Sequence, residues 1–138
     1  MNLKKKWFNI NGVNRMVVYD PESATIADVV RQLGLTGTKI GCGTGQCGAC
    51  SLSIDGELVR GCVRKAEKVP EFAKILTIEG IGTPQNLHPL QQAWITYGGV
   101  QCGFCTPGFI VSAYVLLQKN LAPTREEVRN WFTINRNL

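Results

Sequence analysis

The 138-residue sequence predicts an α+β fold in two parts, and three observations carry that prediction. Short runs of β-branched and aromatic residues fill the first part, and Asn-Gly and Asp-Gly dipeptides join them as in two-residue hairpin turns. These strand signals stop near residues 80–84, where glycine and proline cluster. Beyond that stretch, apolar residues recur at helical spacing. We therefore expect a domain over residues 1–80 and an all-α helical bundle over residues 84–138.

The first part is expected to hold five strands and one helix that crosses them. Thr25 is expected to cap the helix, over residues 26–33, and Gly34 to end it. A helix across a small mixed sheet suggests a β-grasp architecture. The strands are predicted at residues 4–10, 13–19, 51–54, 57–61 and 75–78, with turns at Asn11-Gly12 and Asp55-Gly56.

Three helices are expected in the second part. The first covers residues 89–97, and His88 before it is interpreted as a cap or packing residue rather than a metal ligand. Thr106 is expected to cap the second, with Pro107 at its first position. Thr124 and Glu127 form a capping box for the third. The expected buried faces comprise Leu90, Ala93, Trp94 and Tyr97; Phe109, Ile110, Ala113, Tyr114, Leu116 and Leu117; and Val128, Trp131 and Phe132.

Four cysteines lie in and just after a glycine-rich stretch, residues 41–50. Four residues separate Cys42 from Cys47, two separate Cys47 from Cys50, and Cys62 follows a predicted hairpin. This is the spacing of a plant-type [2Fe–2S] site, in which four thiolates hold the cluster. The interleaved glycines Gly43, Gly45 and Gly48 allow positive φ and bring backbone amides close to the sulfurs.

A second cysteine pair, Cys102 and Cys105, stands before the second predicted helix. A CxxC pair alone is redox-active, zinc-binding or half of a cluster site. The βαβ context of a thioredoxin-like motif is missing. Two thiolates do not complete a [2Fe–2S] site, and no other cysteine is left in the chain. The second site is therefore incomplete in these residues.

Other interpretations of the cysteine-rich stretch were weighed against the cluster. A structural Cys₄ zinc site is the main alternative, although zinc ribbons usually present two CxxC knuckles. The Gly43-x-Gly45-x-x-Gly48 pattern formally matches a dinucleotide fingerprint, but a hairpin follows it instead of a helix. Disulfides are disfavoured because the charged N-terminus lacks a signal-peptide pattern, which points to a cytoplasmic protein.

Composition excludes several classes of protein. With 44% hydrophobic and 18% charged residues, the chain can bury a core. The net charge is +5, and the basic residues are scattered along the chain apart from Lys4-Lys5-Lys6. Neither nucleic acid nor a membrane is therefore expected as a partner. No Ser/His/Asp or paired-carboxylate arrangement suggests a hydrolytic site, and no catalytic residue is assigned.

The chain resembles the N-terminal iron–sulfur region of the molybdenum hydroxylases, the xanthine dehydrogenase and aldehyde oxidoreductase family. The resemblance covers essentially the whole chain. It implies a ferredoxin-like β-grasp domain with one [2Fe–2S] cluster and a four-helix domain with a second. The residues that carry it are Lys39–Cys50, Thr77–Gly80, Leu87–Gln91 and Gln101–Phe109.

The resemblance also implies where the second cluster finds its ligands. Cys102 and Cys105 would supply two of them, and a Cys-Arg-Cys segment that the family places after a stretch like Asn130–Leu138 would supply the others. Two ligands of the second cluster are therefore missing from this sequence. We expect that the sequence is a fragment cut before the Cys-Arg-Cys segment, and the alternative is a natural variant with one stable cluster. Gln101 and Cys102 would lie against the molybdopterin in the intact enzyme.

The expected function is electron transfer within an oxidoreductase that hydroxylates an aldehyde or an N-heterocycle. Electrons would pass from the molybdenum site through both clusters to an external acceptor or an FAD subunit. The molybdopterin would be bound by a separate domain or subunit. Two alternatives stay open: a free-standing ferredoxin-like carrier, and a zinc-binding interaction module.

Overall fold

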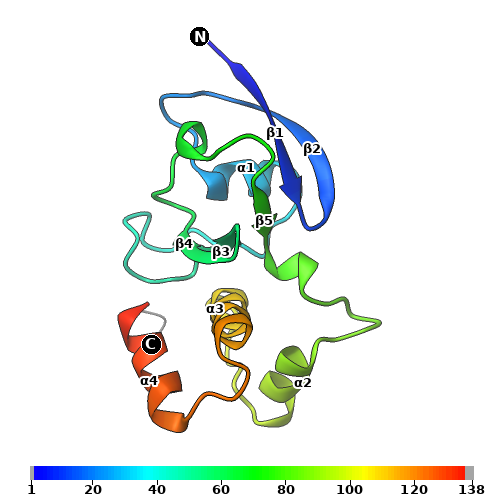
Figure 1. Cartoon of the computed structure of the whole chain (residues 1–138), viewed down its shortest axis with the longest axis vertical. Coiled ribbons are helices and arrows are strands. Elements are labelled where there is room, and N and C mark those ends of the chain that lie inside the picture. The colour runs from blue at the N-terminus through cyan, green and yellow to red at the C-terminus, as the bar shows by residue number, and fades with distance from the viewer. Residues whose placement is uncertain (1, 136–138) are drawn as a thin grey trace.

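The computed structural model describes residues 2–135 and places a five-stranded sheet in the upper half of the molecule (Figure 1). The strand order is β2-β1-β5-β3-β4. Strands β1 and β5 pair in parallel, and the other neighbours pair antiparallel. This mixed sheet confirms the expected architecture of the first part. The strands are β1 (Lys4–Ile10), β2 (Val13–Tyr19), β3 (Ser51–Ile54), β4 (Glu57–Arg60) and β5 (Lys74–Leu76).

Both predicted hairpin turns are present. Asn11 and Gly12 have φ of 53° and 85°, and Asp55 and Gly56 have φ of 51° and 84°. Positive φ at both central residues is the geometry of a type I′ turn, whose twist matches that of the flanking strands. The two turns set the register of β1 on β2 and of β3 on β4.

Helix α1 (Ile26–Gln32) buries its apolar side against the sheet. A capping box joins Thr25 and Asp28, as expected for the cap, and Gly34 has a φ of 89°. The helix ends one residue earlier than predicted, because Leu33 is the C-cap. The core combines helix and sheet residues, among them Phe8, Ile10, Ile26, Val30, Leu52 and Ile75.

The end of β5 differs from the prediction. The strand stops at Leu76, and Ile78–Gly80 forms a short 3₁₀ helix, η2, where a strand to Ile78 was expected. The Thr77 N–H donates to Asn11 Oδ1 at 2.9 Å, so the β1–β2 turn takes the hydrogen bond that a longer ladder would need. A second 3₁₀ helix, η1 (Ala66–Lys68), was not predicted.

Up to Asn135, the last residue that the structure describes, three α-helices form the lower half: α2 (Pro89–Thr96), α3 (Thr106–Lys119) and α4 (Arg125–Ile134). Helix α3 lies beneath β3 and β4, between α2 and α4 (Figure 1). Its buried residues are Gly108, Ile110, Val111, Ser112, Ala113, Val115 and Leu116. Phe109, Tyr114 and Leu117, which were expected in this face, are only half-buried, whereas Val111 and Val115 were missed.

In the lower half, two of the three predicted helix caps are confirmed. The Leu90 N–H donates to His88 Nδ1 at 3.0 Å, and the Glu127 N–H donates to Thr124 Oγ1 at 3.1 Å. The predicted cap at Thr106 is wrong, because Cys105 already has helical dihedral angles and holds the N-cap position.

The predicted inward face of α2 is also wrong at Tyr97. This residue is the C-cap of α2 and is 86% exposed. Trp131 and Phe132 of α4 are half-buried, and the Trp131 Nε1–H donates to Ser112 Oγ at 2.9 Å. Residues 136–138 of the predicted helical part lie outside the described residues. Within residues 2–135, no helix has the length and apolar character needed to cross a membrane.

Candidate metal centre

The cysteine-rich stretch is an irregular loop between α1 and β3. Gly43, Gly45 and Gly48 have φ of 69°, 80° and 77°, a region where residues with a Cβ are strained. These glycines let the backbone fold around the Cys42 sulfur. The predicted role of glycine in this loop therefore has a conformational basis.

Cys42 sits in a cradle of backbone amides. Its Sγ accepts hydrogen bonds from the N–H groups of Thr44, Gln46 and Cys47 at 3.3, 3.2 and 3.3 Å. Together with a bond from the Thr44 hydroxyl, the largest effect, these amides lower the pKa of Cys42 to about 5. The side chain is therefore a thiolate at neutral pH, the form that binds metal.

Cys50 and Cys62 meet at the base of the β3–β4 hairpin. The Gly61 N–H donates to the Cys50 carbonyl at 3.0 Å, which returns the chain to the loop just before Cys62. Burial raises the pKa of the Cys50 thiol to about 11, although a hydrogen bond with the Cys62 backbone opposes the rise. Metal binding at Cys50 would therefore release a proton.

Cys47 depends on the absence of a side chain at Gly41. A Cβ at Gly41 would lie 2.9 Å from Cys47 Sγ and 3.3 Å from Phe104 Cε1. The Ala49 N–H donates a hydrogen bond to Cys47 Sγ, with 3.5 Å between the nitrogen and the sulfur. Gly41 thus leaves room for both the sulfur and the aromatic ring.

The second pair of cysteines lies at the start of α3. Cys102 and Cys105 are both exposed, and Gln101 beside them is exposed as well. The first turn of α3 rests against the glycine-rich loop: a Cβ at Gly108 would lie 2.5 Å from the Gly48 carbonyl oxygen. The structure thereby brings the loops that carry the two cysteine groups into contact.

The six cysteines fall into two groups in the fold. Within residues 2–135, no three Cys, His, Asp or Glu side chains converge as ligands of one metal ion. A [2Fe–2S] cluster does not require that, since four thiolates share two irons. Cys42, Cys47 and Cys50 lie on one loop, Cys62 follows one hairpin, and Cys102 and Cys105 lie just before α3.

Several residues near the loop were not predicted from the sequence. Arg60 donates from Nε to the Gly45 carbonyl at 3.3 Å and from Nη1 to Ser51 Oγ at 2.7 Å. Its place two residues before Cys62 was the available signal. Val63 packs on Gly45: its Cγ2 lies 3.2 Å from the position that a Cβ at Gly45 would take. Phe104 and Val63 gave no signal of their own, because their contacts are set by the tertiary fold.

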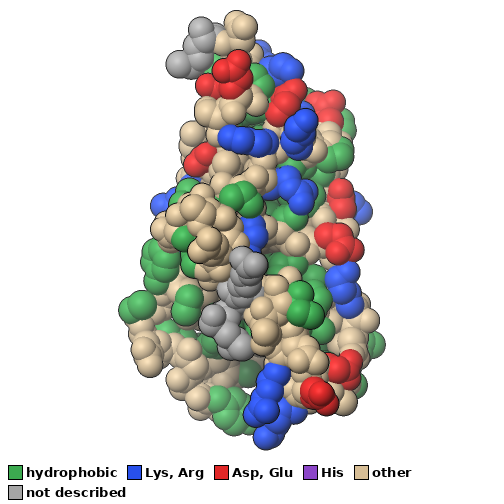
Figure 2. Space-filling view, turned by 90° about the vertical axis from the view of Figure 1, so that its left-hand side faces the viewer, with side chains coloured by type: hydrophobic (Ala, Val, Ile, Leu, Met, Phe, Trp, Pro, Cys, Tyr) green, Lys and Arg blue, Asp and Glu red, His purple; other side chains and the backbone are tan. Residues whose placement is uncertain are grey.

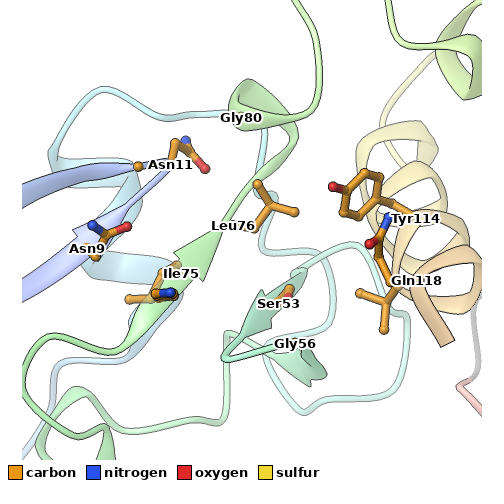
Figure 3. Close-up of a pocket in the computed structure, with 12 residues that line it drawn as sticks. Asn9, Asn11, Ser53, Gly56, Ile75, Leu76, Gly80, Tyr114 and Gln118 are labelled. Carbon is orange, nitrogen blue, oxygen red and sulfur yellow. The ribbon is translucent and has the colours of Figure 1, made fainter.

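A cavity of about 590 Å³ lies away from these cysteines, between the sheet and α3 (Figure 3). Tyr114 and Gln118 of α3 face Ser53 and Leu76 across it. None of the six cysteines, all of which are described, lines this cavity. It is therefore separate from the metal centre.

Comparison with known proteins decides the family. The profile of the 2Fe-2S iron-sulfur cluster binding domain matches residues 8–76, and that of the [2Fe-2S] binding domain matches residues 77–137. The chain is 40% identical to the nicotinate dehydrogenase small FeS subunit of Eubacterium barkeri, covering 87% of this chain and 76% of that subunit. The chain belongs to the [2Fe–2S] iron–sulfur domains of the molybdenum hydroxylases. The resemblance expected from the sequence is confirmed.

Two longer members of this family, both aldehyde oxidoreductases, are more similar in sequence. The chain is 56% identical to the aldehyde oxidoreductase of Megalodesulfovibrio gigas, covering 96% of this chain and 15% of that protein. The crystal structure of the aldehyde oxidoreductase from Desulfovibrio desulfuricans superposes with a TM-score of 0.95 at 52% identity, over 98% of this chain and 15% of that one. These matches confirm the α+β fold and the expected electron-transfer role of [2Fe–2S] domains in an oxidoreductase.

Proposed function

We propose that Cys42, Cys47, Cys50 and Cys62 hold one [2Fe–2S] cluster and that Cys102 and Cys105 hold part of a second. The observation that carries the proposal is the cradle of three backbone amides on the Cys42 sulfur. Amide hydrogen bonds to the sulfurs tune the reduction potential of such clusters. When bound, the first cluster would supply one-electron storage, and this chain would control its potential and its access to water.

We further propose that the chain forms two domains, over residues 1–80 and 84–138, and links a molybdopterin site to an electron acceptor. Gln101 and Cys102 would meet the domain or subunit that binds molybdopterin, and their exposure leaves them free for that contact. Electrons would then pass to the first cluster and on to an FAD subunit or an external acceptor. A cysteine-based site with free thiols favours the reducing cytoplasm.

The substrate of the complete enzyme is proposed to be an aldehyde or an N-heterocycle. The relatives support both classes, since one is named an aldehyde oxidoreductase and another a nicotinate dehydrogenase subunit. The test is to add acetaldehyde or nicotinate to the complete enzyme without oxygen. Bleaching of the cluster absorption by one compound alone would identify its class, and bleaching by neither would contradict the proposal.

Metal analysis and electron paramagnetic resonance of the dithionite-reduced chain test the cluster assignment. We expect about two irons per chain and one [2Fe–2S] signal. Zinc without iron would support the alternative interaction module and overturn both redox proposals. Two fully occupied clusters within these 138 residues would contradict the incomplete second site.

Copurification distinguishes a free-standing carrier from a component of a larger enzyme. A component should copurify with a molybdenum-containing domain or subunit, whereas a carrier would purify alone and reduce several acceptors. The helical half favours the component, because Cys42, Cys47, Cys50 and Cys62 all come from the sheet half and a simple carrier needs no helical extension.

A further inference from the structure

The glycine-rich loop is bordered by half-exposed apolar side chains. Val63 and Phe104, which are 52% and 46% exposed, both touch it. Each turns one side to the loop and the other to water. On the face shown in Figure 2, hydrophobic side chains also gather at mid-height along one margin, where charged side chains are few.

Phe104 reaches the loop from the helical half. It stands between Cys102 and Cys105, and its ring edge lies 3.3 Å from the position of a Cβ at Gly41. Cys47 Sγ lies 2.9 Å from the same point. The ring edge and the sulfur therefore both lie next to the position that a Cβ at Gly41 would take, although their residues are far apart in the sequence.

Val63 contacts the loop at another point. Its two methyl groups lie 3.2 and 3.4 Å from the position of a Cβ at Gly45. Gly45 lies between Cys42 and Cys47, and Val63 directly follows Cys62. The two side chains thus contact the loop at Gly41 and at Gly45, next to different cysteines.

We propose that Phe104 and Val63 are positioning residues that limit the access of water to the first cluster and thereby lower its reduction potential. Reduction adds negative charge, which an apolar, poorly hydrated surrounding disfavours. The cover on the Cys47 side comes from the loop of the second cysteine pair. The helical half therefore helps to set the potential of the cluster in the sheet half. This inference rests on the proposed function, because it presumes that the first cluster is bound.

The test compares Phe104→Ala and Val63→Thr with the wild-type chain after iron–sulfur reconstitution. Val63→Thr keeps the shape and replaces a methyl group by a hydroxyl group. We expect a higher reduction potential in both variants. We also expect cluster loss to a chelator to be about fivefold faster in Phe104→Ala, since a half-buried ring is removed.

Phe72→Ala is the matched control, because Phe72 is 54% exposed but packs on Trp7, in the sheet. Phe104→Leu should restore a potential close to that of the wild type. Unchanged potential and chelation rate in both test variants would overturn the inference while leaving the proposed function intact. A wild-type chain that binds no iron–sulfur cluster would overturn both, and circular dichroism excludes misfolding as the cause of any change.

Discussion

At the scale of single residues, one thiolate ligand decides whether the first cluster is held. We predict that Cys47→Ser loses most of the iron of the reconstituted chain, because a hydroxyl group replaces one of four thiolates. Iron content and the visible spectrum measure the loss. Cys102→Ser is the control and should retain the first cluster. Equal iron in Cys47→Ser and the wild type would refute the assignment of Cys47.

Phe72 carries a strained backbone conformation, with a φ of 62°. Its ring stacks on Trp7 with centroids 6.4 Å apart, a contact that a smaller side chain would lose. We predict that Phe72→Gly is more stable than Phe72→Ala by up to about 1 kcal/mol, because relief of the left-handed strain exceeds the extra chain entropy of glycine. Urea unfolding measures the difference.

The control for this comparison is Trp7, which lies in the extended strand β1. There the order should reverse, since glycine weakens a strand that alanine tolerates better. Phe72→Ala more stable than Phe72→Gly would show that the left-handed conformation carries no cost at this position.

At the scale of elements, the contact between α3 and the glycine-rich loop leaves no room for a methyl group. Glycine to alanine within a helix usually stabilises it by about 1 kcal/mol. We predict the opposite sign for Gly108→Ala, a loss of about 1–3 kcal/mol, because the new Cβ would lie 2.5 Å from the Gly48 carbonyl oxygen. Urea unfolding followed by circular dichroism measures the change. Gln118→Ala, at an exposed residue of α3 that lines the cavity, should stay within about 0.5 kcal/mol, and a stabilised Gly108→Ala would disprove the tight contact.

A network of side chains joins β1, β2 and η1 and makes stability depend on pH. The Glu67 carboxylate accepts hydrogen bonds from Lys4 Nζ at 2.7 Å and from the Tyr19 hydroxyl at 2.6 Å. The hydrogen bond from Lys4 has the larger effect and that from Tyr19 the next, and both hold the pKa of Glu67 below its usual value. Burial of the Tyr19 hydroxyl, the larger effect, and its hydrogen bond to Glu67 raise the pKa of Tyr19 to about 12.

The two shifts predict stability changes in opposite directions. The Tyr19 contribution is complete below pH 10 and is lost as the pH rises from 10 to about 12, because the folded state then holds the proton more tightly. The Glu67 contribution is present above its ordinary pKa and is lost as the pH falls through the lowered value. Urea unfolding across the pH range measures both.

Single substitutions separate the two effects. Tyr19→Phe should flatten the alkaline decline, and Glu67→Gln the acid one. Glu57→Gln is the control, since Glu57 pairs with Lys119 at an exposed site. Declines that persist in both test variants would show that other groups cause the pH dependence.

The elements also show where prediction from the sequence succeeds. The strands β1, β2 and β3 were predicted with their observed bounds, because alternation and the turn dipeptides are local signals. The end of β5 was mispredicted because Asn11, distant in the sequence, binds Thr77. Tyr97 was misplaced because helical periodicity does not show which faces find a partner.

In the candidate site, too, local sequence patterns were predictable and tertiary contacts were not. The spacing of Cys42, Cys47 and Cys50 is a local pattern and indicates the cluster directly. The contacts of Phe104 with the loop and of Gly108 with Gly48 join segments about sixty residues apart, and only the folded chain reveals them.

At the scale of the whole molecule, the two halves are coupled through the glycine-rich loop. The first cluster would tie this loop to Cys62 at the end of the β3–β4 hairpin, and α3 rests on the same loop at Gly48. Metal binding that orders the loop should therefore also steady the first turn of α3, because metal sites couple to folding. Helix α4 contacts α3 but is held by its own capping box and by Trp131.

We predict that removal of iron speeds amide hydrogen exchange in residues 42–50 and also in residues 106–110. Exchange in residues 125–134 should change little, which makes α4 the internal control. Hydrogen exchange read by mass spectrometry on the reconstituted and chelated chain tests this directly, because exchange reports local opening segment by segment. If exchange becomes faster in the loop but stays unchanged in residues 106–110, the contact at Gly108 does not couple the loop to α3. Equal acceleration in all three segments would instead mean that the cluster stabilises the chain as a single cooperative unit.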